Sequence, residues 1–120
     1  MALVPAWILR VQVPVGVRSR RRPLDSVRAV LDVLRAHSRA GHVGDYDDVS
    51  HATVARERFV APGAPAATQC TVVTLTTYLV GAERAEVEAL ARSIAAVHPW
   101  EHPVIECVGP EGAFLWMAEG

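Results

Sequence analysis

The segment Val97-His98-Pro99-Trp100-Glu101-His102-Pro103 lies between a helical pattern and a strand pattern, and it determines how these two elements are connected. It places two imidazoles, a carboxylate, an indole and two prolines in seven residues. Pro99 cannot continue a helix, because its ring removes an amide hydrogen and clashes with the preceding turn. The segment therefore predicts a sharp corner between a helix and a strand, and it is the densest cluster of chemically active side chains.

The patterns on either side of this corner are regular. Before it, apolar residues recur at helical spacing, namely Val87, Leu90, Ala91, Ile94 and Val97. After it, residues 104–108 read as a strand. Further back, residues 70–80 form the clearest strand of the chain, rich in threonine and β-branched residues. Its two faces carry Val73, Leu75 and Leu79 on one side and Thr74, Thr76 and Tyr78 on the other.

The N-terminal half repeats this arrangement. Residues 7–13 alternate with the period of a half-buried strand, and Val27, Val30, Leu31 and Leu34 then follow at helical spacing. Between them, residues 18–22 form a basic loop, interpreted either as solvated or as an anion site. Gly41 and Gly44 bracket a turn that opens a second strand through about Thr53, which residues 56–59 extend.

The order of elements is therefore β-α-β-β-α-β within one domain, residues 1–120, and it predicts an α+β ferredoxin-like sandwich. Its four-stranded antiparallel sheet has the strand order fourth, first, third, second, with both helices on one face. Residues 114–117 add a short apolar strand or an arm, which favours contacts between subunits because small monomers seldom expose such a patch.

Two motifs together resemble a known family. The corner segment, read with Gly41-His42-Val43-Gly44-Asp45-Tyr46-Asp47-Asp48-Val49-Ser50, resembles the small domain of the NIF-three-like (NGG-interacting factor) proteins. That domain is similar in fold to CutA and the PII signalling proteins. Trp100, His102 and Asp45 replace a tyrosine, a glutamate and an asparagine of the family pattern. The dimetal centre of the larger relatives belongs to a separate domain with no counterpart here, so the resemblance implies a fold and no reaction.

Composition limits the choice of partners. The chain of 120 residues has a net charge of −1, and its twelve basic residues are all arginine. This near-neutral balance argues against nucleic acid, whose binding normally needs a clear basic excess. No apolar run approaches the ~20 residues that span a bilayer, and the N-terminus lacks the charge order of a secretory signal. We expect a cytoplasmic protein without a membrane partner.

The face of the sheet away from the helices is the first candidate ligand site. It is expected to show Arg10, Gln12, Thr74, Thr76, Tyr78 and Glu106, with Asp45 and Trp100 as further ligand contacts. An isolated domain would leave this face in water. Homo-oligomers of related folds instead cover it or join their sheets edge to edge, which turns the same residues into a polar pocket.

The corner segment is the second candidate site. One helical turn would bring His98, Glu101 and His102 together as ligands for zinc, copper or iron(II). The two prolines favour an extended path, so a structural corner with His98 as helix cap and Trp100 packed is an alternative. A proton-transfer role for His98 or Glu101 is a third. His51 lies roughly 14 Å from this corner, three strand spacings away, and can join a metal site only from a neighbouring subunit.

Two functional hypotheses follow. The first is a homodimeric or homotrimeric CutA-like module that binds a small molecule or a divalent transition metal in a polar pocket between subunits. The second is a small cofactor-free enzyme of the cyclase, isomerase or dehydratase type, with His98, Glu101 and Tyr46 as acid-base groups in the same pocket. A purely structural oligomerisation domain would need only the apolar tail and the sheet edges.

Overall fold

The computed structural model describes the chain except for residues 1–2, 16–21, 23 and 118–120, so most of the predicted basic loop lies outside the described residues. The elements follow the order β1 (Ala6–Val15), α1 (Asp25–Ala36), β2 (Ser50–Phe59), β3 (Thr68–Val80), α2 (Arg84–Val97), β4 (Ile105–Gly109) and β5 (Gly112–Leu115). This confirms the predicted β-α-β-β-α-β order and shows that the apolar tail begins as a strand. Neither helix is long and apolar enough to cross a membrane, a finding limited to the described part of the chain.

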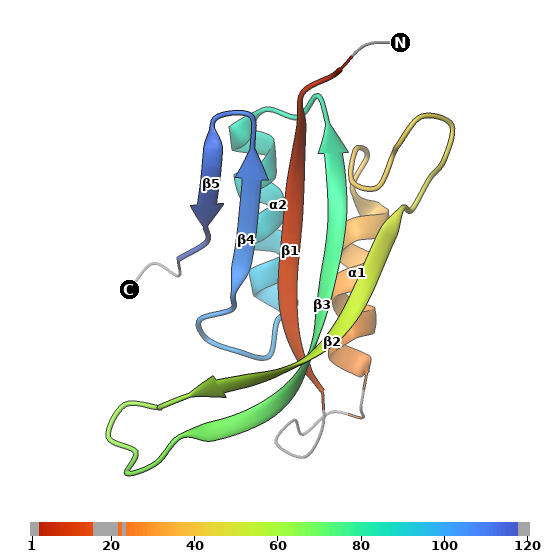
Figure 1. The fold of residues 1–120 in the computed structure, drawn as a ribbon. Coiled ribbons are helices and arrows are strands. Elements are labelled where there is room, and N and C mark those ends of the chain that lie inside the picture. The colour runs from red at the N-terminus through yellow and green to blue at the C-terminus, as the bar shows by residue number, and fades with distance from the viewer. Residues whose placement is uncertain (1–2, 16–21, 23, 118–120) are drawn as a thin grey trace.

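The strands form one antiparallel sheet in the order β2-β3-β1-β4-β5, and both helices pack behind it (Figure 1). The predicted order of the first four strands is confirmed. β4 was expected at an edge, and this was wrong, because β5 pairs with it along residues 112–115. Among the described strands, β2 and β5 therefore form the two edges of the sheet.

The core lies between the sheet and the helices. Trp7, Leu9, Val11 and Val13 point toward the helices and are each at most 3% exposed, as the alternation of β1 predicts. Val27, Val30 and Leu34 of α1 and Val87, Leu90 and Ile94 of α2 complete this layer. Each such apolar side chain contributes about 1.5–3 kcal/mol through its burial. The even-numbered residues of β1 consequently face away from both helices.

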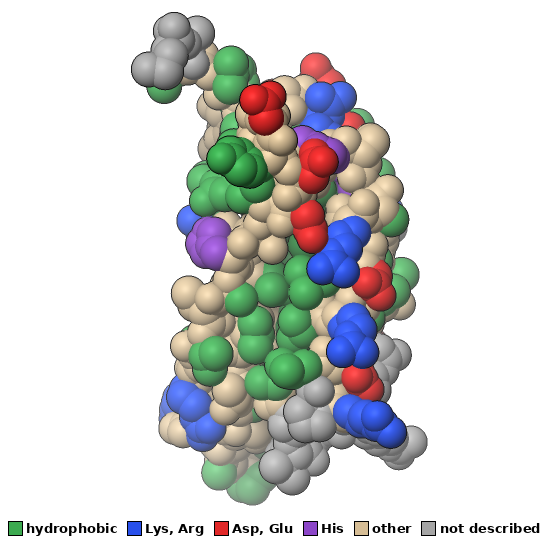
Figure 2. Space-filling model, turned by 90° about the vertical axis from the view of Figure 1, so that its right-hand side faces the viewer, with side chains coloured by type: hydrophobic (Ala, Val, Ile, Leu, Met, Phe, Trp, Pro, Cys, Tyr) green, Lys and Arg blue, Asp and Glu red, His purple; other side chains and the backbone are tan. Residues whose placement is uncertain are grey.

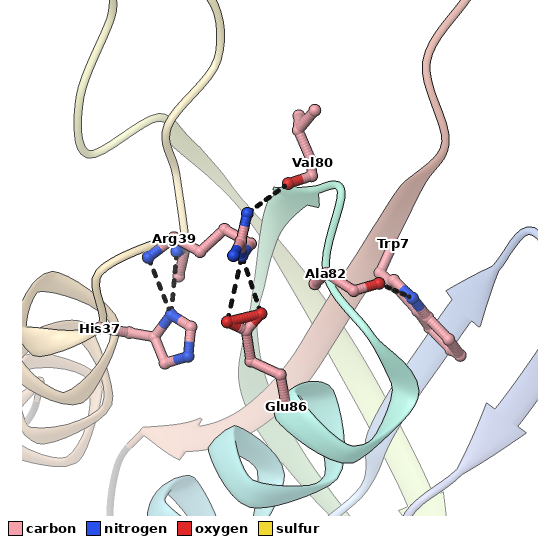
Figure 3. Close-up of polar contacts among 7 residues, drawn as sticks. Trp7, His37, Arg39, Val80, Ala82 and Glu86 are labelled. Atoms are coloured by element: carbon pink, nitrogen blue, oxygen red, sulfur yellow. Dashed lines mark hydrogen bonds and ion pairs between the residues drawn. The ribbon is translucent and has the colours of Figure 1, made fainter.

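Two polar anchors join the helices to the sheet at one end of the core (Figure 3). The guanidinium of Arg39, after α1, pairs with the Glu86 carboxylate of α2 at 2.8 Å and donates to the Val80 carbonyl at 3.4 Å. The indole Nε1 of Trp7 donates to the Ala82 carbonyl at 3.0 Å. These contacts hold the turn between β3 and α2 against both β1 and the end of α1.

The hairpin of β2 and β3 is long and bends. Its distal part crosses below the lower ends of β1 and β4, toward the loop that joins α2 to β4 (Figure 1). There the Phe59 ring meets the Trp100 ring edge-on, with centroids 6.4 Å apart. The bend therefore brings the far end of β2 close to the corner segment, although β2 and β4 are separated by two strands.

The second strand begins later than predicted. Val43 and Tyr46 form an isolated bridge that closes a tight turn, and Gly41 and Gly44 have positive φ angles of 79° and 57°. Asp48 also has a positive φ, 56°, so the chain is not extended there. The prediction that the strand opens directly after the glycine turn was therefore wrong, and β2 runs from Ser50 to Phe59.

Candidate functional site

The helix-free face carries a continuous row of side chains across the sheet. The strand register aligns Leu115, Glu106, Arg10, Thr76 and His51, one residue from each of the five strands. Side chains of directly opposed residues point to the same face. In the next rows, Gln12 lies opposite Thr74, and Ile8 lies opposite Tyr78. The six residues predicted for this face therefore share it.

The row is held by polar contacts. Arg10 Nη1 and Glu106 Oε1 lie 2.6 Å apart, and the two side chains are 40% and 45% exposed. A pair this exposed contributes less than about 1 kcal/mol to stability. Tyr78 Oη lies 3.4 Å from His51 Nε2, and Thr76 is buried beside them. The ion pair thus orients a guanidinium and a carboxylate at little energetic cost, and a ligand can replace either contact.

Glu57 was missed by the sequence analysis. When the Gln12 amide is oriented with its nitrogen toward β2, Nε2 donates to Glu57 Oε2 at 2.9 Å. Partial burial raises the pKa of the Glu57 carboxyl above its ordinary value. The sequence did contain a signal for its position. In a strand that extends to Phe59, the alternation that starts at His51 puts Thr53, Ala55 and Glu57 on the same face. Glu57 adds a carboxyl group to the candidate site.

His98 lies inward from this face as a structural corner. It follows the last residue of α2, is 8% exposed, and its Nε2 lies 2.6 Å from the Gln12 carbonyl oxygen. Its Nδ1 accepts a hydrogen bond from the Trp100 amide at 3.1 Å. These partners require the neutral imidazole with hydrogen on Nε2. Burial accordingly lowers the pKa of His98, and the hydrogen bond to Gln12 only partly opposes this shift.

The structure does not bring His98, Glu101 and His102 together as a metal site within one chain. Both His98 nitrogens are engaged, whereas Glu101 and His102 are exposed on the loop before β4. The described residues contain no group of three histidine, cysteine or acidic side chains that fits a metal ion. The physical reason is that α2 ends before His98, whose extended backbone (φ −74°, ψ 140°) turns its ring toward β1, while Glu101 and His102 lie in the bend that follows.

Tyr46 and Asp45 lie away from this corner. Tyr46 is 75% exposed in the turn before β2, and this turn is tied to the Tyr78 end of β3 by the bond from Gly41 N to Tyr78 O. His98 instead contacts Gln12, opposite Thr74. The turn before β2 and the loop after α2 lie toward opposite ends of the sheet (Figure 1). One chain therefore does not assemble the predicted set of His98, Glu101 and Tyr46.

Trp100 does approach the polar face. Its ring packs against His98, with centroids 5.5 Å apart, and against Phe59 from the bent hairpin. Phe59 is 38% exposed, and Trp100 is half-buried. The face thus has a polar row of Arg10, Glu106 and Thr76, and an end with Gln12, Glu57 and an aromatic pair. This combination can hydrogen-bond a small molecule that bears both charged and apolar groups.

Comparison with known proteins defines the fold class. No protein-family model matches the sequence, and no curated protein matches it. The fold is that of the CutA-like, ferredoxin-like α+β proteins, as the similarity to solved structures of a NIF3-related protein and of CutA1 shows.

A Bacillus cereus protein related to NIF3 superposes with a TM-score of 0.70 at 15% identity, over 94% of this chain and 28% of that one. The divalent ion tolerance protein CutA1 from Ehrlichia chaffeensis gives 0.61 at 13%, over 94% and 88%. A phage SAM lyase in its apo state gives 0.54 at 12%, over 97% and 92%. The chain thus spans about a quarter of the NIF3-related protein, and the resemblance seen in its motifs is confirmed for the fold.

Proposed function

We propose that this chain is a homo-oligomeric, CutA-like module that binds a small polar ligand on the helix-free face of its sheet, in a pocket completed by a neighbouring chain. The observation that supports this proposal most is the row from Glu106 through Arg10 and Thr76 to His51. It offers donors and acceptors of both charges on one rigid surface. The row ends at the free edge formed by β2.

The edge strand β2 supports the oligomer. None of its ten residues is buried, Val54 is 74% exposed, and among the described residues no strand lies beside its outer edge. A long unprotected edge is a template for pairing with another chain. Figure 2 shows that hydrophobic side chains gather on the side formed by β2 and α1, beside a column of alternating charges. Pairing of β2 with its own copy gives a dimer, and pairing with the partner's β5 gives a closed ring such as a trimer.

The interface is tested by Val54→Asp. Val54 lies opposite Val73, so its side chain is on the helix side of β2, and a strand that pairs with β2 would lie directly beside it. A carboxylate there leaves the monomer fold intact but loses part of its hydration when the strands pair, which is unfavourable. We expect the variant to elute as a monomer in size-exclusion chromatography with light scattering, at concentrations where the wild-type chain is oligomeric. Val4→Asp is the control, because Val4 is 62% exposed but precedes β1. An unchanged mass for Val54→Asp would exclude this face of β2 from the interface.

The ligand site is tested with a panel of amino acids, dicarboxylates and nucleosides, using the shift in melting temperature. For any compound that stabilises the wild-type chain, Arg10→Gln is expected to weaken binding at least tenfold, because it removes a charge-assisted hydrogen bond worth about 1.5–3 kcal/mol. Arg35→Gln is the matched control, since Arg35 of α1 also forms an exposed ion pair, with Asp48, and its side chain is 60% exposed. Equal affinities of Arg10→Gln and wild type would remove Arg10 from the site.

A divalent metal is the less favoured ligand. The name of the CutA1 neighbour supports it. The described residues of one chain do not provide three donors, so a metal would need side chains from two chains, such as His51 of one and His102 of another. Equilibrium dialysis against zinc tests this version: bound zinc should disappear in Val54→Asp. Less than a tenth of an equivalent in the wild-type oligomer would rule the metal version out.

A second candidate is a small cofactor-free enzyme that uses the same face. Two observations favour it: the raised pKa of Glu57 beside Gln12, and the similarity over almost the whole chain to a protein named as a lyase. In this version Glu57 is the acid-base group, in place of His98, Glu101 and Tyr46, which the sequence had predicted for this role. Glu57→Gln should then lower kcat at least a hundredfold for a substrate found among the ligands and leave its Kd nearly unchanged. Full turnover would leave only the binding function.

A further inference from the structure

A second site is suggested by a mismatch between the width of the sheet and that of the helix layer. Two helices of about 10 Å diameter cover roughly four strands spaced about 4.8 Å apart. The sheet has five strands, and β5 lies beyond α2 (Figure 1). A cavity of about 280 Å³ is left between α2 and the inner side of β4 and β5. It lies on the opposite side of the sheet from the proposed ligand face.

Three aromatic side chains form part of the walls of this cavity. Trp7, Phe114 and Trp116 line it, and the rings of Trp7 and Phe114 are tilted by 38° with centroids 5.8 Å apart. Trp7 is fixed by its bond to the Ala82 carbonyl and by Gly109, whose missing side chain leaves room for the indole. Trp116 is held through its backbone amide, which donates to the Ile105 carbonyl at 2.8 Å. The aromatic slot is thus formed before any ligand binds.

The rim of the cavity is basic. The Arg84 guanidinium lies 4.0 Å from the Phe114 ring centroid, and the Arg92 guanidinium lies 5.5 Å from that of Trp116. Arg84 also contacts Glu88 at 3.1 Å, whereas Arg92 has no carboxylate partner in the described part of the chain. Two arginines and one glutamate give the rim a net charge of +1. A single anionic group would balance this charge.

Two further groups in the lining fit an anionic ligand. The Cys107 thiol is neutral near pH 7, because burial foremost, with the charges of Glu106 and Glu88, raises its pKa to about 11. It therefore adds no negative charge. The Trp116 Nε1 is buried with no acceptor among the described residues. A buried donor without a partner is unfavourable, and a ligand oxygen that reached it on a small rotation of the indole would remove this penalty.

We propose that this cavity binds a small aromatic carboxylic acid, with its ring among Trp7, Phe114 and Trp116 and its carboxylate on Arg92. The volume lies just below the usual range for drug-sized ligands, so one ring or two fused rings fit. Planar rings pack against the aromatic walls, and the guanidinium offers paired donors to a carboxylate. The three rings and Arg92 all belong to one chain, and none of them lies on the polar face.

The test uses the full chain and 4-fluorophenylacetate, followed by ¹⁹F NMR and isothermal titration calorimetry. We expect saturable binding, at least tenfold weaker binding of the neutral 4-fluorophenylacetamide, and a similar loss in Arg92→Gln. Arg28→Gln, an exposed arginine on α1, and Arg10→Gln, on the other face, should bind like wild type. Phe114→Leu should weaken binding at least fivefold, with its folding checked by circular dichroism.

Three results would overturn the proposal: no saturable binding at millimolar acid, equal binding of acid and amide, or an Arg92→Gln variant that binds like wild type. The monomeric Val54→Asp variant should retain the site, since none of its lining residues belongs to β2. Loss of binding in Val54→Asp together with Arg10→Gln would place the probe on the polar face instead.

Discussion

Gly109→Ala is expected to lower the free energy of unfolding by about 3 kcal/mol, at the upper end of the usual cost of overpacking a core. A Cβ atom at this position would lie 2.5 Å from two carbon atoms of the Trp7 ring. The indole cannot move aside easily, because it is 3% exposed and bonded to the Ala82 carbonyl. Urea denaturation followed by circular dichroism measures the change.

The control for this substitution is Gly63→Ala in the turn between β2 and β3. Gly63 has a φ of +75° and no atom near an added Cβ, so only backbone strain of about 1 kcal/mol is expected. If Gly109→Ala lowers the free energy of unfolding no more than Gly63→Ala does, β4 does not pack closely on Trp7. The aromatic cavity next to it would then lose its fixed wall.

His98→Ala is expected to destabilise the fold by about 3 kcal/mol, because a buried side chain with two hydrogen-bond partners is removed. The Gln12 carbonyl loses its donor, and the Trp100 amide loses its acceptor. His102→Ala is the control, since His102 is exposed on the same loop and its loss should change stability by less than about 0.5 kcal/mol. Similar unfolding midpoints for both variants would contradict a structural role for His98.

The pH dependence of stability gives a second readout of His98. Its pKa in the folded protein lies below the ordinary value of 6.5, so the unfolded chain binds the proton more tightly. The stabilisation is therefore complete above about pH 6.5 and is lost as the pH falls from there through the lower pKa of the folded state. The wild-type melting temperature should drop more over this window than that of His98→Ala. Parallel curves would show that His98 is not buried as the neutral imidazole.

Local periodicity was sufficient to predict most of the fold. The alternation from Trp7 to Val13 indicated which side of β1 faces the helices, and the spacing of Val27, Val30 and Leu34 indicated the buried side of α1. Both patterns are strict because one side of each element is buried and the other is not. The polar face followed directly, since its residues are the remaining half of the same alternation.

The features that the sequence did not predict depend on backbone conformation and on tertiary contacts. The turn from Asp45 to Asp48 has polar residues that suit a charged edge strand equally well, and only the positive φ of Asp48 distinguishes the two. Glu57 reaches Gln12 because the hairpin bends, and no local pattern reports a bend. The sequence left the role of His98 undecided, because its hydrogen-bond partner is a backbone carbonyl 86 residues away.

The oligomer is the central claim, since the polar row lies open in a single chain and ends at the free edge of β2. Sedimentation velocity of the wild-type chain at micromolar concentration tests it most directly. We predict a species of two or three times the chain mass of 13.0 kDa that persists on tenfold dilution. A single species with the mass of one chain would contradict the shared pocket.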